Sequence, residues 1–502
     1  MKLLNRFSGL IFVLFLVLLG YLYSYFEIIN DPADGIHVWR QTDGLSIAQK
    51  FFEEGNSLFK PEMHNRLGGE GKAAGEFPFM YYIVSIFYHI FGVHNWVFRS
   101  VWILTSMIGY YFLYRFCADL LKDKIWAMLI SLFTFTSPIL IVYGASFLPD
   151  PIALAFIFIA WYYLYKYVNE RNRKHLVITC IFVVLSATLK ITSLLSILAF
   201  AVVLGASLLI KRIRWQISTQ ALIYKFIPFV ISFLVIFAWY YYASWYNKVN
   251  ETSYFYLRSA PIWSLSSQEI NEVALRLKGW SREYFYATGL HCLYAFALLT
   301  IIPISKKELK SPFYWIYFFS ILGFIAFVAL FYSQFSYHDY YVINLLFIIP
   351  LTLIFWVKKY GFILQKRRWI NYTFQGLFLV LLIASVIHGK RRAEERFAIE
   401  TGWLDKDLYE LREQLESYGM DQNDLVLVPH DPSSNITLYA INMNGWTALN
   451  SIREPRIFQE KIDQGAKWLI VSDSSYYDNS IIDPYRDKLQ LDFKGIRVYN
   501  LQ

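Results

Sequence analysis

Residues 30–78 read NDPADGIHVWRQTDGLSIAQKFFEEGNSLFKPEMHNRLGGEGKAAGEFP and lie between two strongly apolar regions. The stretch holds acids, bases and several glycines, which lipid-facing helices rarely tolerate. A connection of this length with structure of its own is usually functional. We therefore expect the fold to be organised around this loop.

Residues 44–54 within this loop have the periodicity of a helix. Apolar side chains occupy one face and polar side chains the other: Leu45, Ala48, Phe51 and Phe52 against Gln49, Lys50, Glu53 and Glu54. Gly55 supplies a helix stop. On a helix through this region, Arg40 and Asp43 are three positions apart and share a face.

Composition sets the class of protein. The chain has 502 residues, of which 56% are hydrophobic and only 17% charged, and its repeated apolar runs of about twenty residues predict a polytopic membrane protein. The net charge of +9 does not indicate nucleic-acid binding, because the basic residues form short clusters between apolar runs, as in cytoplasmic loops. The cysteines show no metal-ligand spacing and are interpreted as small core residues.

The apolar runs predict about eleven transmembrane helices. With the amino terminus in the cytoplasm, every inner loop is basic and residues 30–78 form a long first extracytoplasmic loop. Residues 77–91 are too short for a crossing and predict an interfacial or re-entrant segment. The expected crossings are residues 7–29, 95–116, 125–143, 152–167, 176–189, 194–210, 227–246, 289–304, 313–332, 342–357 and 369–388.

The composition changes to that of a soluble domain near residue 391. We therefore divide the chain into a transmembrane domain, residues 1–390, and an extracytoplasmic domain, residues 391–502. Two expected helices, residues 408–418 and 457–464, alternate with apolar strands at residues 424–429, 468–472 and 496–499. This alternation predicts a small α/β fold with a short sheet and no phosphate-binding loop. The sequon at Asn435 matters only in a secretory eukaryotic cell.

The residues that could carry chemistry gather at the outer membrane edge under this topology. They are Asp34, His37, Arg40, Asp43, Glu76, Asp150, Lys190, Arg258, Arg282, His338, Asp339 and Tyr341. Taken together they concentrate carboxylates and cations on one face of the membrane, which a random set of interface residues would not do.

Structural roles compete with the functional ones. Asp34 beside Gly35 fits a turn, and Arg40 with Asp43 fits an ordinary helical salt bridge. Asp150 could cap the helix that follows it, whereas Lys190 could extend to the membrane interface. His37 fits a surface histidine, and Tyr340 and Tyr341 fit belt aromatics at the level of the lipid headgroups.

Four motifs resemble the type-C glycosyltransferase superfamily of integral-membrane enzymes. They are His37-x-Trp-Arg-Gln-x-Asp43, Glu76-Phe-Pro78, Leu148-Pro-Asp150 and His338-Asp-Tyr-Tyr341. The protein O-mannosyltransferases and the lipid A aminoarabinose transferase are relatives in that superfamily. In those relatives an acidic residue of the first outer loop is the catalytic base, and Asp43 is its best match. Gly44 follows Asp43 where relatives commonly carry an Asp-Glu pair, so Asp34 remains an alternative base.

The resemblance implies transfer of a hexose or pentose from a polyprenyl-phosphate donor to a glycan, lipid or protein acceptor, with inversion at the anomeric carbon. Asp43 would act as the base, and Glu76 or Asp150 would orient the acceptor or a metal. Arg40, Lys190, Arg258, Arg282 and His338 would contact the phosphate or the sugar. The other expected substrate-binding residues are His37, Asp150, Asp339 and Tyr341. The metal is unknown and no cofactor is certain, although a divalent cation remains an option.

Two other classes of function stay open. A lipid-linked glycan transporter or flippase would carry ionisable groups deep in its spans, whereas here they lie at the span ends. A non-catalytic membrane protein of glycan assembly would keep the topology without depending on Asp43. The expected location is the inner or plasma membrane.

Overall fold

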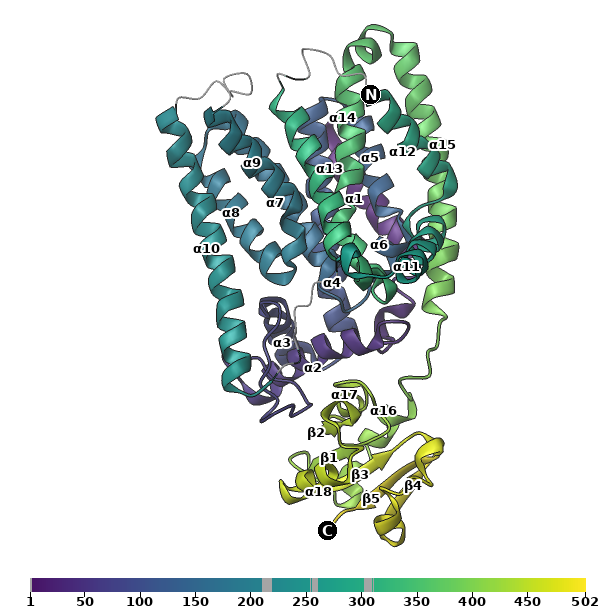
Figure 1. Cartoon of the computed structure of the whole chain (residues 1–502). Helices are drawn as coiled ribbons and strands as arrows, with labels where there is room; N and C mark the ends of the chain where they lie inside the picture. The colour runs from purple at the N-terminus through teal and green to yellow at the C-terminus, as the bar shows by residue number, and fades with distance from the viewer. Residues whose placement is uncertain (1, 210–218, 253, 255–260, 302–308, 310) are drawn as a thin grey trace. The chain divides into compact units, whose positions relative to one another are not determined.

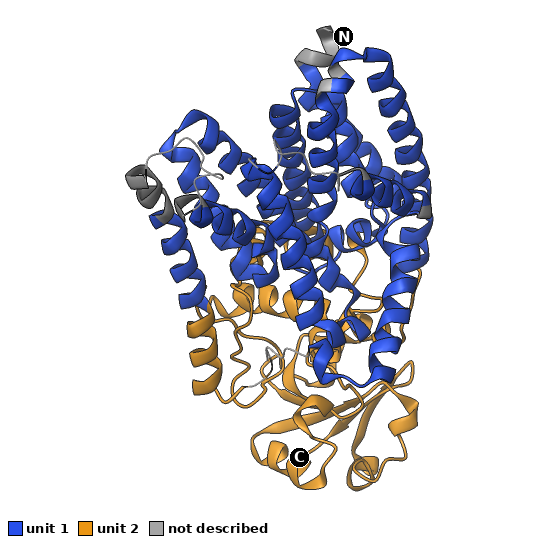
Figure 2. Ribbon diagram, turned by 45° about the horizontal axis from the view of Figure 1, so that its top comes forward, with its two compact units in different colours: residues 1–29, 99–239, 257–396 blue, residues 30–98, 240–256, 397–502 orange. Residues whose placement is uncertain are grey.

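The computed structural model describes the chain except residues 1, 210–218, 253, 255–260, 302–308 and 310 (Figure 1). It is mostly helical, with one small sheet near the carboxy terminus. The chain divides into two compact units (Figure 2). Unit 1 comprises residues 1–29, 99–239 and 257–396, and unit 2 comprises residues 30–98, 240–256 and 397–502.

Unit 1 is a bundle of apolar helices in which α7 packs along α8 and α9 packs against α13. The helices that build it are α1 (Lys2–Leu22), α4 (Asn95–Leu121), α5 (Lys124–Phe135), α6 (Pro138–Gly144), α7 (Asp150–Glu170), α8 (Arg173–Leu189), α9 (Leu195–Leu209), α10 (Thr219–Val249), α11 (Ser267–Trp280), α12 (Thr288–Ile301), α13 (Pro312–Leu330), α14 (Ile348–Lys366) and α15 (Arg368–Phe397). The ends of α4, α10 and α15 extend into residue ranges assigned to unit 2.

Five described helices are long and apolar enough to cross a membrane, or six if the bent pair α5 and α6 is one span. Shorter apolar helices include Phe7–Leu22, Phe79–Phe91, Ile191–Ala206 and Gly289–Leu299. A helix lies at each of the expected crossings, and the count of eleven stays a prediction.

The expected crossing at residues 125–143 is not one straight helix. It is broken between α5 and α6, with a bend of 72°. Pro138 is the first residue of α6. Because proline lacks an amide hydrogen and its ring clashes with the preceding turn, the helix restarts there instead of continuing.

In unit 2, the first loop begins with α2 (Val38–Glu54), which ends at Gly55 with φ +63°. The predicted stop is therefore confirmed, and the helix begins six positions earlier than residue 44. The predicted polar face was wrong for two residues, since Gln49 is 0% and Lys50 6% exposed. The physical reason is that α17 (Ile436–Ile441), from the far end of the chain, packs on α2.

Helix α3 (Phe79–Phe91) also packs on α2. Its inner face buries Tyr81, Val84 and Tyr88, whereas Ile90 and Phe91 are exposed. Thirteen residues are too few to cross a bilayer, which needs about 20. The amphipathic helix therefore has the form expected of residues 77–91, and its interfacial position remains a prediction.

The carboxy-terminal sheet has strand order β2-β1-β3-β5-β4. Strand β1 runs parallel to β2 and β3, whereas β5 is antiparallel to β3 and β4. The strands are β1 (Leu425–Val428), β2 (Asn444–Thr447), β3 (Ala466–Val471), β4 (Leu489–Phe493) and β5 (Ile496–Asn500). The helices around it are α16 (Asp407–Arg412), α17 and α18 (Pro455–Asp463). The three expected strands and the small mixed sheet are present, and sequence periodicity missed β2 and β4.

The first loop joins this sheet at its β2 edge. The amide of Arg66 donates to the Gly445 carbonyl over 2.8 Å, and the Gly445 amide donates to the His64 carbonyl over 3.1 Å. A Cβ atom at Gly445 would lie 2.0 Å from the Val426 carbonyl oxygen, so only glycine fits between the two strands. Pairing at the edge also satisfies backbone groups that an open edge would leave bare.

Residues 397–502 thus pack with residues 30–98 in one compact unit. The boundary that we place at residue 390 separates the expected transmembrane domain from the expected extracytoplasmic domain, and it remains a prediction.

A candidate glycosyltransferase site

Asp43 lies in α2, and its side chain is 0% exposed. Its Oδ2 accepts a hydrogen bond from the Tyr254 hydroxyl over 2.6 Å. Its Oδ1 accepts from Ser434 Oγ over 2.5 Å and from Asn435 Nδ2 over 2.9 Å. The guanidinium of Arg40 lies 3.8 Å from Oδ2, as the i, i+3 spacing predicts. Three donors and a cation thus compensate a carboxylate that burial removes from water.

Burial raises the pKa of the Asp43 carboxyl above its usual value. The charge of Arg40 and the hydrogen bonds from Ser434, Tyr254 and Asn435 act in the opposite direction but do not cancel the effect of burial. A carboxylate whose affinity for a proton is increased in this way has the property that a general base needs.

Sequence reasoning missed three partners of this carboxylate: Tyr254, Ser434 and Asn435. Trp39 is a fourth member of the cluster, because its Nε1 donates to Tyr254 Oη over 2.7 Å and to Ser434 Oγ over 3.0 Å. Nothing in the local sequence signals Tyr254 or Ser434. The sequon drew attention to Asn435, but its side chain is 0% exposed and bonded to Asp43.

Glu76 forms an ion pair with Arg40, and Tyr81 donates its hydroxyl to Glu76 over 2.6 Å. Burial by itself raises the pKa of Glu76, but the charge of Arg40 and the hydrogen bonds outweigh it, so the pKa lies below the usual value. Arg40 therefore lies between two carboxylates, of which Glu76 is held ionised.

Asp34 lies outside this cluster of bonds. Its carboxylate accepts from the Gly35 amide over 2.6 Å and lies 3.6 Å from Lys406 Nζ, with 21% of the side chain exposed. Gly35 has φ +83°, so the pair has the turn geometry expected from the sequence. His37 occupies the N-cap position of α2 without a side-chain capping bond and is 9% exposed.

The second group of expected site residues lies in unit 1. Lys190 Nζ is 3.1 Å from Asp150 Oδ1, and Asn344 donates to the same oxygen over 3.3 Å. Asp150 is 1% exposed and begins α7. The ammonium of Lys190 lies 4.3 Å from the ring centre of Tyr341. Lys190 is thus bound by a carboxylate and an aromatic face, which is more than a membrane anchor requires.

His338 stacks on Tyr341, with 5.1 Å between the ring centres. Its neighbour Asp339 is 2% exposed, accepts from the Tyr143 hydroxyl over 2.6 Å and forms an ion pair with Arg396. Arg396, which the sequence did not single out, lies 4.6 Å from the ring centre of Tyr284. Asp339 is thus a partner of Arg396 within unit 1.

One expected phosphate contact, Arg282, is not part of either group. Arg282 is exposed and lies in a π-helical turn, Ser281–Phe285. Arg258 lies outside the described residues. Among the residues that the structure describes, no three His, Cys, Asp or Glu side chains are grouped to hold a metal ion.

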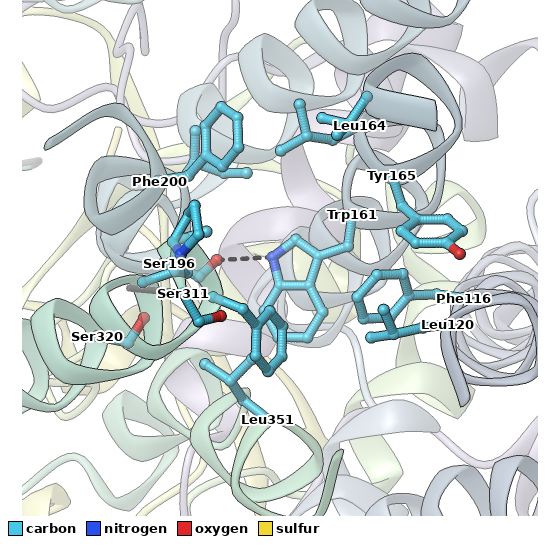
Figure 3. A pocket seen from close by; sticks show the side chains of 15 residues that line it. Phe116, Leu120, Trp161, Leu164, Tyr165, Ser196, Phe200, Ser311, Ser320 and Leu351 are labelled. Carbon is cyan, nitrogen blue, oxygen red and sulfur yellow. Dashed lines mark hydrogen bonds between the residues drawn. The ribbon is translucent and has the colours of Figure 1, made fainter. Parts of the chain in front are cut away.

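Unit 1 also contains an apolar cavity between α4, α7, α9, α13 and α14 (Figure 3). Aromatic side chains line much of it, including Phe116, Trp161 and Phe200. Trp161 Nε1 donates to Ser196 Oγ over 3.0 Å at its wall. Such a lining suits hydrocarbon.

Comparison with known proteins adds three findings. Residues 74–245 match the family model described as dolichyl-phosphate-mannose-protein mannosyltransferase, a range that contains Glu76, Asp150 and Lys190. No curated protein sequence matches the chain significantly. Crystal structures of ArnT from Cupriavidus metallidurans, bound to undecaprenyl phosphate and in the apo state, superpose with TM-scores of 0.62 and 0.60.

The chain has the fold of the type-C glycosyltransferase superfamily. Sequence identity to the two ArnT structures is only 12% and 10%, but each alignment covers 98% of this chain and 97% of that one. A cryo-EM structure of arabinofuranosyltransferase AftD from mycobacteria is also similar, with a TM-score of 0.50 and 11% identity over 91% of this chain and 35% of that one. The fold that the resemblance implies is thereby confirmed, and the mannosyltransferase family model matches residues 74–245 of the chain.

Proposed function

We propose that this protein is an inverting membrane glycosyltransferase that uses a polyprenyl-phosphate sugar as donor and Asp43 as general base. The observation that carries the proposal is the buried Asp43 carboxylate, which is held by three side-chain donors beside Arg40. ArnT from C. metallidurans binds undecaprenyl phosphate, and this supports a donor of the polyprenyl-phosphate class.

The reaction needs a base for one proton and cations for one leaving group. The acceptor hydroxyl attacks the anomeric carbon of the donor sugar, and the bond from that carbon to the phosphate oxygen breaks. Asp43 Oδ2 takes the hydroxyl proton, and the lipid phosphate leaves with the electron pair. The Tyr254 hydroxyl, 2.6 Å from Oδ2, occupies the position that we assign to the acceptor hydroxyl.

Lys190 is our principal candidate for binding the donor phosphate, with Asp150 and Tyr341 orienting its ammonium group. Arg258, Arg282 and His338 remain proposed contacts to phosphate or sugar. Glu76 holds Arg40 beside the base. We further propose that the acceptor is an extracytoplasmic glycan, lipid or protein, and that the protein resides in the plasma or inner membrane.

The test is a transfer assay with the full chain in membranes and a panel of radiolabelled polyprenyl-phosphate hexoses and pentoses. One donor should lose its sugar to a membrane or surface acceptor. Asp43→Asn should lower the rate about 10²–10⁴-fold, the usual contribution of general-base assistance. Asp34→Asn should have a much smaller effect, because the Asp34 carboxylate accepts a hydrogen bond within a turn.

The outcomes separate the classes of function. An inactive Asp34→Asn with a fully active Asp43→Asn would move the base to Asp34. Full activity of Asp43→Asn, Asp34→Asn and Glu76→Gln would reject the carboxylate mechanism. Passage of the labelled lipid across the bilayer with no sugar transfer would favour a flippase.

A further inference from the structure

Asn435 is one of two adjacent residues, with Ser434, through which the carboxy-terminal segment contacts Asp43. Its side-chain oxygen accepts from the Asn65 amide over 3.0 Å, and Ser46 Oγ lies 3.4 Å from the same oxygen. Because a backbone amide can only donate, this contact assigns the oxygen and nitrogen of the Asn435 side chain. The Nδ2 group is therefore the atom that faces Asp43 Oδ1, at 2.9 Å.

A chain of buried polar groups fixes Ser46 behind Asn435. Ser46 Oγ lies 2.8 Å from His64 Nδ1, and His64 Nε2 lies 2.9 Å from Asn442 Oδ1. Asn442 Nδ2 donates to Glu53 over 2.9 Å, so its oxygen must be the acceptor of the His64 proton. Ser46 and His64 are both 0% exposed. The imidazole is thus neutral, with its proton on Nε2 and Nδ1 accepting from Ser46.

The backbone that carries Asn435 is fixed independently. The Asp431 carboxylate accepts from the amides of Ser433 and Thr437 over 2.7 and 2.9 Å. Asn65 Nδ2 donates to the Ser434 carbonyl over 2.9 Å. Both the chain and the side chain at position 435 therefore have a single arrangement, and two separate segments of unit 2 impose it.

The two oxygens of Asp43 have different surroundings as a result. Oδ1 accepts two hydrogen bonds from the carboxy-terminal segment, whereas Oδ2 accepts one, from Tyr254. We propose that Asn435 is a positioning residue that occupies Oδ1, so that Oδ2 is the oxygen that receives the acceptor proton. On this proposal the carboxy-terminal domain completes the catalytic site instead of serving as an appendage. The inference rests on the proposed role of Asp43.

The experiment measures protonation of Asp43 directly. Infrared pH titration of the purified full chain, with Asp43→Asn as the reference for subtraction, follows the carboxyl stretch of this residue. In Asn435→Leu, which has nearly the same shape but no donor, and in Asn435→Ala, each compared with its own Asp43→Asn double variant, the titration midpoint should rise. Loss of one hydrogen bond to an ionised group corresponds to about one pH unit. The acid limb of kcat/KM, measured with the donor found in the panel, should move in the same direction, with KM for the donor unchanged.

Other titratable groups near Asp43 are shared by all variants: Arg40 at 3.8 Å, Tyr254 at 2.6 Å, and Glu76 and His64 behind them. Asn423→Ala is the matched control, because Asn423 is exposed and its side chain bonds to Asp421. It should titrate as the unsubstituted protein does.

An unshifted midpoint in either folded Asn435 variant would overturn the inference, and so would failure of both to fold, which would make Asn435 a structural residue only. These failures are distinct from failure of the proposed function. If Asp43→Asn is inactive while the Asn435 variants keep the wild-type midpoint, Asp43 remains the base and the positioning role alone is rejected. If Asp43→Asn is fully active, the proposed base is wrong.

Discussion

The Nδ2 atom of Asn435 donates to Asp43 Oδ1 over 2.9 Å, although 392 positions separate the two residues in the chain. Each side chain is fully buried. A buried carboxylate whose partner comes from so far away ties its chemistry to the folding of the carboxy-terminal segment. Loss of that segment would remove two of the three hydrogen bonds to this buried carboxylate, those from Ser434 and Asn435, and would make its charge costlier to keep.

The pH dependence of activity should follow Asp43. Because burial raises the pKa of this carboxyl, activity should fall with decreasing pH at a midpoint above the ordinary value of 3.8. Glu76→Gln should move that midpoint to lower pH, because it removes a carboxylate that competes with Asp43 for the charge of Arg40. Initial rates from pH 4 to pH 9 would measure both effects. An upward shift in Glu76→Gln would contradict this arrangement of charges.

The Asp43 and Glu76 carboxyls contribute to the free energy of unfolding with opposite dependence on pH. A carboxyl whose pKa is raised in the folded state binds its proton more tightly there, so its contribution to stability decreases as pH rises from 3.8 through the raised value. The pKa of Glu76 is lowered, so its contribution is present above the unfolded value of 4.5 and is lost as pH falls through the folded value. Thermal unfolding of Glu76→Gln should therefore depend less on pH in the acid range.

Removal of the Lys190 charge should weaken binding of undecaprenyl phosphate, if this ammonium holds the donor phosphate. The structure adds a second effect, because Lys190→Met also removes the ammonium group that lies 3.1 Å from the Asp150 carboxylate, which is 1% exposed. Breaking a buried pair in this way costs about 3–5 kcal/mol. The double variant Lys190→Met/Asp150→Asn should regain much of the lost thermal stability without regaining lipid binding.

Binding of undecaprenyl phosphate by each variant, measured beside thermal unfolding, separates the two effects. Unchanged affinity in the folded double variant would reduce Lys190 to the partner of Asp150. As a control, Lys390→Met removes an exposed ammonium that lies 3.6 Å from Glu394, one helical turn away. This substitution should alter neither quantity, because exposed pairs contribute little.

The helix at the centre of the site shows how far sequence reasoning extends. The stop at Gly55 and the shared face of Arg40 and Asp43 are local properties, set by backbone conformation and by a period of 3.6 residues, and both were predicted. The burial of Gln49 was not, because α17 covers it and no local pattern identifies a partner from the end of the chain.

The same reason explains which site residues were found. Asp43, Glu76 and Lys190 were identified because ionisable residues are unusual beside apolar runs. Tyr254, Ser434 and Asn435 are common polar residues in ordinary surroundings, and their importance comes only from their distances to Asp43. Hydrogen-bond partners that are brought together by tertiary packing have no characteristic spacing in the sequence.

Gly445→Ala should separate the first loop from the sheet. The added Cβ would lie 2.0 Å from the Val426 carbonyl oxygen, and the strand would have to move away from β1 or from residues 64–66. Overpacking of this kind costs about 1–3 kcal/mol. Because His64 and Asn65 support Asn435, transfer activity should fall together with stability.

Gly279→Ala is the matched control, since this glycine lies in α11 with nothing within 4 Å of an added Cβ. It should be neutral or stabilising by up to about 1 kcal/mol. Equal thermal stability and activity in both variants would show that the contact between residues 64–66 and β2 does not support the site.

The last prediction concerns topology. We expect the first loop and the carboxy-terminal domain to lie on the same, outer side of the membrane, because the expected inner loops are basic. Gly68 is unsuitable for a cysteine probe, since a Cβ there would lie 2.1 Å from the Glu251 carbonyl oxygen. Glu70 in the first loop and Ser475 in the carboxy-terminal domain are exposed, and both suit a cysteine probe.

In a background with Cys117, Cys180 and Cys292 changed to serine, Glu70→Cys and Ser475→Cys should both react with a membrane-impermeant maleimide in intact cells. Arg173→Cys, at the start of α8 in an expected inner loop, should react only after the membrane is opened. An additional crossing at residues 77–91 would place Glu70 and Ser475 on opposite sides, so labelling of only one of them in intact cells would refute the arrangement. Labelling of Glu70→Cys and Ser475→Cys only in opened membranes would invert it, and Asp43 could then not act on an extracytoplasmic acceptor.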